Sequence, residues 1–356
     1  MRVLFVYRFL TVGGVETVLR ARLDGLGQWG IEAHAWFFHD LGGRSVFLGL
    51  RDRVRVGRPE ACLQQLGHGF DLVCSIDTDE IFSAFNGTHR PRLVIECHTP
   101  YPANLEYLRH LGLCRPAAFF VPSRYQREVV LERVGEGTDV RVVPNPLRPE
   151  FTEELRPFAA RPARPVVAWI GRMDDLKNWK GFLRLAGTLE RQAADVEFWM
   201  AGSFVEKRGA EELFSRARQE GVLGRLRWFR GLPHVRVPAF LDAVRDSGGV
   251  VISTSRGESF GMTVAEAMAR GCAVLAPRRP PFTEFVDDGA TGELYSSPNG
   301  GGEVWEPVAG RIQDLLVDVR RRELLGRAGR EAILRDYSPD PALSVLAREL
   351  RRVAEG

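Results

Sequence analysis

The segment best suited to chemistry is RGESFGMTVAEAMARG, residues 256–271, which carries Glu258 and Glu266. The apolar run VVIST before it predicts a strand, and the residues after Gly261 predict a helix. Unpaired backbone N–H groups at the start of that helix would stabilise an anion such as a phosphate. Each carboxylate can accept two hydrogen bonds side by side and so bind a vicinal pair of hydroxyls. With Glu258 on the loop and Glu266 inside the helix, the pattern predicts a sugar-nucleotide site.

Two cations follow another predicted strand, in the segment WIGRMDDLKNWKG. Arg172 comes directly after this strand, and Lys177 follows five residues later. Together they could neutralise a diphosphate, the arginine through its planar fork and the lysine as a point charge. Lys180 is an alternative to Lys177; the spacing from Arg172 favours Lys177 without deciding between them.

Two further strand ends carry candidate residues in the first half of the chain. Gly13 and Gly14 follow the run RVLFVY and would let a phosphate or an acceptor approach the backbone. His98 ends the apolar run RLVIECH. A Gly-Gly pair or a lone histidine is, by itself, equally compatible with a structural role.

Strand-like and helix-like segments alternate along the whole chain. Short apolar runs such as DLVCSI, AAFFVPS and VEFWMAGS suit strands that are buried on both faces, and their alternation with helices predicts parallel sheets. A proline-rich segment from Pro144 to Pro165 interrupts this alternation and predicts a connection between two doubly wound domains, residues 1–155 and 156–337. Residues 338–356 predict an amphipathic helix that can return to the first domain. Ligands are expected in the cleft between the domains, at the carboxyl ends of the strands.

The composition limits the classes of protein to which this sequence can belong. A length of 356 residues suits two domains, and 49 basic against 46 acidic residues give a net charge of only +3. Without a dense basic run, a nucleic-acid partner is not expected. The five cysteines are scattered in apolar runs, which predicts buried free thiols and a cytoplasmic location. The apolar opening MRVLFVYRFL predicts a core strand, not a signal peptide, and no run is long enough to span a membrane. The mild basicity is compatible with peripheral attachment to the inner face of a membrane.

The segment GESFGMTVAEAMARGCAVLAP resembles the donor-binding signature of the family four retaining glycosyltransferases of the GT-B fold, in which two Rossmann-like domains face a central cleft. The resemblance implies that Glu258 contacts the donor sugar and that Glu266 contacts the ribose. The backbone that would line the sugar and the diphosphate belongs to Phe260, Gly261, Met262 and Thr263.

The same resemblance extends to the other motifs. It implies that Arg172 and Lys177 stabilise the leaving nucleoside diphosphate, that the Gly13–Gly14 loop covers the diphosphate and the acceptor, and that His98 lies beside the donor sugar. The first domain would then be the acceptor side, and the second would bind the nucleotide sugar. Tyr101, Asn104 and Tyr107 follow His98 and are expected near the acceptor.

Two segments depart from the family pattern. Pro146 stands where the family has a glycine after Asn145, which removes support for a hinge role of that asparagine. Glu284 matches a further family glutamate, but bulky and cyclic residues replace the small ones expected before it, so it is assigned no catalytic role. These replacements are Arg278, Arg279, Pro280 and Pro281.

A rival motif is Asp77-Thr78-Asp79, which resembles the metal-binding triplet of the other large glycosyltransferase fold. The triplet opens a predicted helix, where aspartates commonly serve as caps. Neither a metal nor another cofactor is therefore expected.

The favoured hypothesis is a metal-independent, retaining glycosyltransferase that moves a sugar from a nucleotide diphosphate sugar to an acceptor hydroxyl by internal return. An epimerase or phosphorylase of the same fold, and a non-enzymatic protein that binds sugar nucleotides, stay open as alternatives. The nucleotide base stays open too, as does the acceptor, which could be a glycan, a lipid-linked sugar or a small metabolite.

Overall fold

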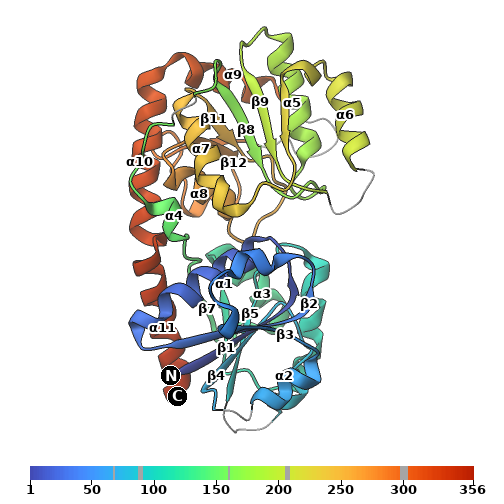
Figure 1. Cartoon of the computed structure of the whole chain (residues 1–356), viewed down its shortest axis with the longest axis vertical. Coiled ribbons are helices and arrows are strands. Elements are labelled where there is room, and N and C mark those ends of the chain that lie inside the picture. The colour runs from blue at the N-terminus through green and yellow to red at the C-terminus, as the bar shows by residue number, and fades with distance from the viewer. Residues whose placement is uncertain (67–68, 87–90, 159–160, 205–208, 297–303) are drawn as a thin grey trace. The chain divides into compact units, whose positions relative to one another are not determined.

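The computed structural model describes residues 1–66, 69–86, 91–158, 161–204, 209–296 and 304–356. They form two compact units, each built on one parallel sheet (Figure 1). Unit 1 comprises Met1–Pro149 and Asp336–Gly356, and unit 2 comprises Glu150–Arg335. The chain enters unit 2 earlier than residue 156, the predicted start of the second domain, because helix α4 (Pro149–Thr152) buries Phe151 against His234 of unit 2.

The sheet of unit 1 has seven strands in the order β3-β2-β1-β4-β5-β6-β7. Their bounds are β1 (Arg2–Leu10), β2 (Glu32–Asp40), β3 (Val54–Val56), β4 (Leu72–Ile76), β5 (Arg92–Glu96), β6 (Ala118–Val121) and β7 (Val140–Val142). The helices of this unit are α1 (Gly14–Gly25), α2 (Pro59–Leu66), α3 (Arg124–Val134) and α11 (Pro339–Glu355). Short 3-10 helices are η1 (Leu26–Trp29), η2 (Gly43–Phe47), η3 (Arg51–Arg53), η4 (Phe82–Phe85) and η5 (Pro102–Leu113).

Unit 2 has six strands in the order β10-β9-β8-β11-β12-β13. Their bounds are β8 (Val166–Ile170), β9 (Glu197–Ala201), β10 (Leu226–Phe229), β11 (Val250–Ile252), β12 (Ala273–Pro277) and β13 (Glu293–Tyr295). The helices are α5 (Trp179–Arg191), α6 (Gly209–Gln219), α7 (Val237–Asp246), α8 (Met262–Ala269), α9 (Glu306–Val317) and α10 (Val319–Tyr337), which continues past the end of the unit. Short 3-10 helices are η6 (Leu223–Arg225), η7 (His234–Arg236) and η8 (Phe282–Glu284).

Helix α11 belongs to the core of unit 1, although it lies at the other end of the sequence. Its apolar face shares one buried cluster with β1 and α1. Helix α1 comes so close that a Cβ at Gly25 would lie 2.3 Å from Leu343 Cδ1. The residues that α11 contributes to this cluster are Leu343, Leu346, Ala347, Leu350 and Val353.

Both sheets reverse their strand order beside the first strand of the unit, between β1 and β4 in unit 1 and between β8 and β11 in unit 2. Outside the carboxyl ends of the strands at such a reversal, two successive loops diverge and leave room for a ligand. The loops that follow these four strands are therefore where functional side chains are expected.

The five cysteines are unpaired and buried, as the apolar runs around them predict. Among the helices that the structure describes, none combines the length and the apolar character needed to cross a bilayer.

Candidate functional site

The loop between β8 and α5 carries both predicted cations at the reversal point of unit 2. Asp174 Oδ1 accepts a hydrogen bond from the backbone N–H of Lys177 at 2.8 Å. Asn178, in a left-handed conformation, caps α5 by accepting from the N–H of Gly181 at 3.1 Å. Arg172 pairs with Asp174 at 3.5 Å, and 56% of its side chain is exposed. The loop backbone is thus fixed, while the Arg172 guanidinium reaches solvent.

The central contact of the site is an ion pair between Lys177 and Glu258. Lys177 Nζ lies 2.5 and 2.7 Å from the two carboxylate oxygens of Glu258, and the side chains are 18% and 7% exposed. Ser255 Oγ donates a further hydrogen bond to Glu258 Oε1 at 2.8 Å. The Thr254 hydroxyl donates to the carbonyl oxygen of Asn178 at 2.9 Å and so ties the two loops together. The structure therefore joins two predicted residues that are 81 positions apart.

Helix α8 follows Glu258 and begins after Gly261, which has a φ of +97°. A Cβ at this position would also lie 2.7 Å from Phe282 Cε1, so both the conformation and the packing require glycine. Because glycine has no side chain, no N-cap group covers the first N–H groups of α8, near Met262 and Thr263. Phe260 is buried and stacks on Phe285, with ring centroids 5.4 Å apart, so its ring is part of the core and is not accessible to a ligand.

Glu266 is buried on α8, and its partner was not predicted from the sequence. His234 Nε2 lies 3.0 Å from Glu266 Oε1. His234 comes from η7, and its ring centroid is 5.1 Å from that of Phe151.

In unit 1, the Gly13–Gly14 turn follows β1 and opens α1 at the reversal point of its sheet. Glu16, in the first turn of α1, is buried and accepts a hydrogen bond from the backbone N–H of Thr11 at 2.6 Å. A Cβ at Gly13 would lie 2.9 Å from Glu16 Oε2. The glycine therefore makes room for a carboxylate that holds the loop closed on itself.

His98 follows β5 and is held by a buried charge network. Its Nε2 lies 2.9 Å from Glu96 Oε2, and Arg22 Nη1 lies 3.0 and 2.8 Å from the two oxygens of Glu96. Burial alone would raise the pKa of Glu96, but Arg22 and His98 outweigh it and lower that pKa to about 2. Glu96 is therefore a permanent negative charge that orients the imidazole.

The aspartates of the rival metal motif are occupied by other groups. Asp77 Oδ1 accepts backbone hydrogen bonds from His98 at 2.9 Å and Thr99 at 3.3 Å, and burial raises the pKa of Asp77 to about 6. Asp79 pairs with His110 and lies 3.7 Å from Arg8. Within the described part of the chain, no group of three or more His, Cys, Asp or Glu residues is arranged to hold a metal ion.

Lys180, the alternative to Lys177, lies elsewhere. Its Nζ is 3.1 Å from Glu212 and 3.6 Å from Asp175, and it lies over the ring of Trp179. Only Lys177 pairs with Glu258 among the residues the structure describes.

The three residues expected near the acceptor differ in exposure. Tyr107 is buried in the core of unit 1, where its hydroxyl lies 3.1 Å from Cys97 Sγ, so the structure gives no support for its place at an acceptor site. Asn104 is exposed and Tyr101 is partly buried. The residues that sequence reasoning missed are Arg22, Glu96, His234 and Ser255. Glu96 alone had a visible signal, as an acid inside an apolar run.

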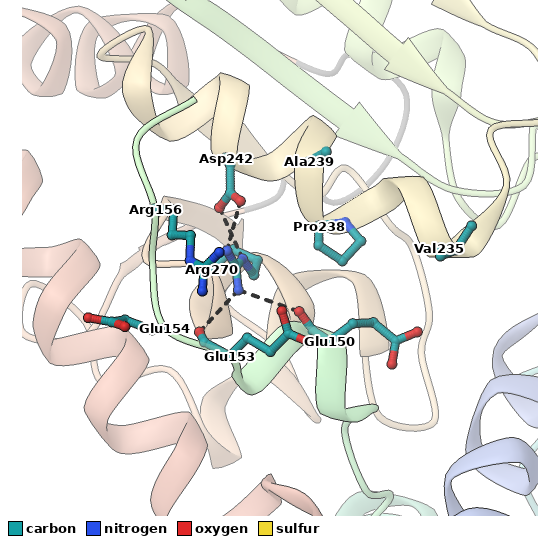
Figure 2. Close-up of a pocket in the computed structure, with 9 residues that line it drawn as sticks. All are labelled: Glu150, Glu153, Glu154, Arg156, Val235, Pro238, Ala239, Asp242 and Arg270. Atoms are coloured by element: carbon teal, nitrogen blue, oxygen red, sulfur yellow. Dashed lines mark hydrogen bonds and ion pairs between the residues drawn. The ribbon is translucent and has the colours of Figure 1, made fainter. Parts of the chain in front are cut away.

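A cavity of about 420 Å³ lies at the other end of α8 (Figure 2). Arg270, just after α8, donates to both carboxylate oxygens of Asp242 at 2.7 and 3.0 Å. None of the predicted site residues lines this cavity. The lining residues are Glu150, Glu153, Glu154, Arg156, Val235, Pro238, Ala239, Asp242 and Arg270.

The two parallel sheets, each covered by helices, define the GT-B fold. The solved structure of Anabaena HepE in complex with UDP and glucose has this fold, with a TM-score of 0.83 at 17% identity, over 99% of this chain and 100% of that one. Residues 150–332, just over half of the chain, match the model of the family "Glycosyl transferases group 1". The chain therefore belongs to the group 1 glycosyl transferases, which confirms the predicted family and fold class.

Relatives of known activity match over part of their length. The sucrose synthase of Acidithiobacillus caldus is 31% identical over 45% of this chain and 21% of its own length. The alpha-maltose-1-phosphate synthase of Mycolicibacterium smegmatis is 32% identical over 49% of this chain and 44% of its own. The chain thus covers less than half of either relative.

Proposed function

We propose that this protein transfers a sugar from a nucleotide diphosphate sugar to an acceptor hydroxyl, with retention of the anomeric configuration and without a metal ion. The observation that carries the proposal is the Lys177–Glu258 pair, in which an ammonium and a carboxylate lie together near the reversal point of the unit 2 sheet and the start of α8. A diphosphate needs the cation and the helix N-terminus, and a sugar needs the carboxylate.

In the proposed reaction, the bond between the anomeric carbon and the donor phosphate oxygen breaks. The new bond forms on the same face, between that carbon and the acceptor oxygen, and the acceptor proton passes to the departing phosphate oxygen. Negative charge builds on the diphosphate, where Arg172, Lys177 and the first N–H groups of α8 stabilise it. Sugar hydroxyls that donate to Glu258 would displace Lys177 from the carboxylate and make its ammonium available to the diphosphate.

The residues of unit 1 have supporting roles in this proposal. His98 is oriented by Glu96 and is assigned to the donor sugar, and the Gly13–Gly14 turn is assigned to the diphosphate and the acceptor. The acceptor class stays open between a glycan, a lipid-linked sugar and a small metabolite. The five buried thiols support a cytoplasmic location.

The first test is binding. UDP, GDP, ADP and their sugars are screened for an increase in the thermal midpoint, because a ligand that binds only the folded state stabilises it. One nucleotide series should raise the midpoint in the wild type and raise it much less in Lys177→Ala. If none of the three series raises the midpoint, the nucleotide-sugar proposal is wrong.

The second test is the product. The donor that binds is incubated with a panel of acceptors in excess chelator, and the anomeric configuration of the product is read by NMR. Retention without added metal supports the mechanism, whereas inversion, or a loss of activity that a divalent metal restores, contradicts it. The donor incubated alone gives the isomer test: conversion without an acceptor would identify an epimerase instead.

A further inference from the structure

Glu266, which the family resemblance assigns to the ribose of the donor, has a neighbour with no role in the reaction described above. His234 Nε2 lies 3.0 Å from Glu266 Oε1, and the two side chains are only 16% and 6% exposed. We propose that His234 is a positioning residue, which holds the Glu266 carboxylate in the orientation that selects for ribose hydroxyls on the nucleotide. This inference rests on the proposed function and deepens it.

The chemistry of the contact sets the direction of the hydrogen bond. A carboxylate can only accept, so the imidazole Nε2–H donates to Oε1. Among the described residues, no hydrogen bond or ion pair reaches the other oxygen, Oε2, of Glu266. His234 thus fixes one oxygen of the carboxylate and leaves the other available to a ligand hydroxyl.

The imidazole is itself held in place by packing. Its ring centroid lies 5.1 Å from that of Phe151, which α4 buries completely. His234 belongs to η7, which leads directly into α7, so its backbone is continuous with that helix. A ring fixed on one side by Phe151 presents a fixed donor to Glu266 on the other.

Arg270 joins the three elements that carry this arrangement (Figure 2). It follows α8 and donates to both carboxylate oxygens of Asp242 on α7. It also donates to the carbonyl oxygens of Glu150 at 3.4 Å and Glu153 at 3.2 Å, at the two ends of the turn formed by α4. The helices that carry Glu266, His234 and Phe151 are therefore connected through one guanidinium.

A prepositioned carboxylate makes the site selective. A site built to accept a hydrogen bond from a ligand hydroxyl rejects an analogue that lacks it, since the acceptor is left without its partner. This penalty requires that the carboxylate hold its orientation when the hydroxyl is missing. Without His234, Glu266 could turn toward solvent, and the analogue would lose less affinity.

The experiment compares UDP, GDP and ADP with their 2′,3′-dideoxy forms by calorimetry, using the pair whose ribonucleotide binds. The wild type should prefer the ribonucleotide by about ten- to a hundredfold, the worth of one hydrogen bond to a charged group. His234→Phe keeps an aromatic ring against Phe151 but removes the donor, and should reduce this preference to less than about threefold. His234→Gln, which keeps a donor amide, should restore most of it.

Controls separate positioning from folding. Val235→Ala changes the neighbouring residue, which is 65% exposed, and should keep the wild-type preference. In a Glu266→Ala background, His234→Phe should have no further effect on the preference. If His234→Phe is not folded by circular dichroism, His234→Asn, whose amide is too short to reach Oε1, takes its place.

The measurements distinguish the ribose contact of Glu266 from the positioning role of His234. If the wild type binds both nucleotide forms equally, Glu266 does not contact the ribose, and the proposed assignment and this inference are both wrong. If the wild type and Glu266→Ala differ in preference as expected but His234→Phe keeps the wild-type value, only the positioning role of His234 is wrong.

Discussion

Each unit places a buried carboxylate beside a cation near the reversal point of its sheet, but the two pairs differ in kind. In unit 1, Glu96 and Arg22 are 0% and 1% exposed, and His98 occupies the remaining approach to the carboxylate. In unit 2, Glu258 pairs with Lys177, whose side chain is 18% exposed and lies on a loop.

The difference separates a structural ion pair in unit 1 from the proposed ligand site in unit 2. The guanidinium of Arg22 contacts both oxygens of Glu96, and neither group can reach water without unfolding the region around it. The ammonium of Lys177 is a compact, rotatable charge that a diphosphate can draw away while sugar hydroxyls replace it on Glu258. A buried carboxylate therefore has a fixed arginine partner in unit 1, whereas we expect ligands to exchange with its lysine partner in unit 2.

The largest expected effect is on the stability of unit 1. Glu96→Ala should lower the free energy of unfolding by about 3–5 kcal/mol, because Arg22 would remain buried without a counter-charge. Glu258→Ala should cost much less, since Lys177 can turn to solvent. Urea denaturation, with hydrogen exchange to locate the loss, measures both. Equal losses of unfolding free energy in the two variants would show that the two ion pairs do not differ in their contribution to stability.

The next largest effect is a loss of activity when residues of unit 2 are substituted. Glu258→Ala and Arg172→Ala should each reduce kcat by about two to three orders of magnitude, the worth of a contact made to developing charge. Their melting temperatures should stay near that of the wild type. Glu284→Ala, at a glutamate with no assigned role, is the matched control and should keep its turnover. Near-normal turnover in both site variants would remove the assignment.

The stability of unit 1 should depend on pH through the buried carboxyl group of Asp77. Burial raises its pKa to about 6, so the folded chain binds its proton more tightly than the unfolded chain does, where the pKa is near 3.8. Its contribution to stability is therefore present below about pH 4 and is lost as the pH rises through about 6. The Asp77→Asn variant lacks this titration. Its free energy of unfolding, relative to that of the wild type, should therefore rise by about 2 kcal/mol between pH 4 and pH 8. A difference between the two proteins that does not change with pH would contradict the shift.

If ligands exchange with Lys177 on Glu258, removing the negative charge of Glu258 should increase the affinity for the nucleoside diphosphate. Glu258→Gln removes the competitor for Lys177 and should tighten binding of the nucleoside diphosphate by about three- to tenfold, although it lowers turnover. Titration calorimetry with the nucleotide found in the thermal screen measures it, and added salt should shrink the difference. Weaker binding than the wild type would show that the pair does not compete with the diphosphate.

The smallest effect is on nucleotide affinity, and it distinguishes Lys180 from Lys177. Lys180 is neutralised by Asp175 and Glu212, so Lys180→Ala should change nucleotide affinity by less than about twofold. Lys177→Ala should lower it by about tenfold or more. The reverse order would make Lys180 the working cation.

Much of the fold was predictable because the signals are local. Buried parallel strands are continuous apolar runs, and their alternation with helices specifies a doubly wound sheet. The candidate site residues could be proposed for the same reason, since Glu258, Glu266, Arg172 and Lys177 all follow such runs. The spacing from Arg172 also favoured Lys177, the lysine that the structure pairs with Glu258.

The supporting partners were not predictable from local patterns. Arg22 and Glu96 are 74 positions apart, and His234 and Glu266 are 32 apart, so no spacing rule connects them. Tyr107 was expected near the acceptor because it follows His98 in the sequence, but its hydroxyl lies beside Cys97 Sγ in the core of unit 1. Unit 2 begins at Glu150, six residues before the predicted start of the second domain, and the contact of Phe151 with a residue 83 positions later has no signal in the local sequence.

The place of α11 in the core of unit 1 constrains the order in which the chain acquires its structure during synthesis. Every residue of unit 2 leaves the ribosome before Leu343 and Leu346 do, so unit 2 can complete its core while unit 1 still lacks one wall. The half of the protein that is translated first therefore matures last. A nascent chain stalled before Pro339 should hold a protease-resistant unit 2 and a protease-sensitive unit 1.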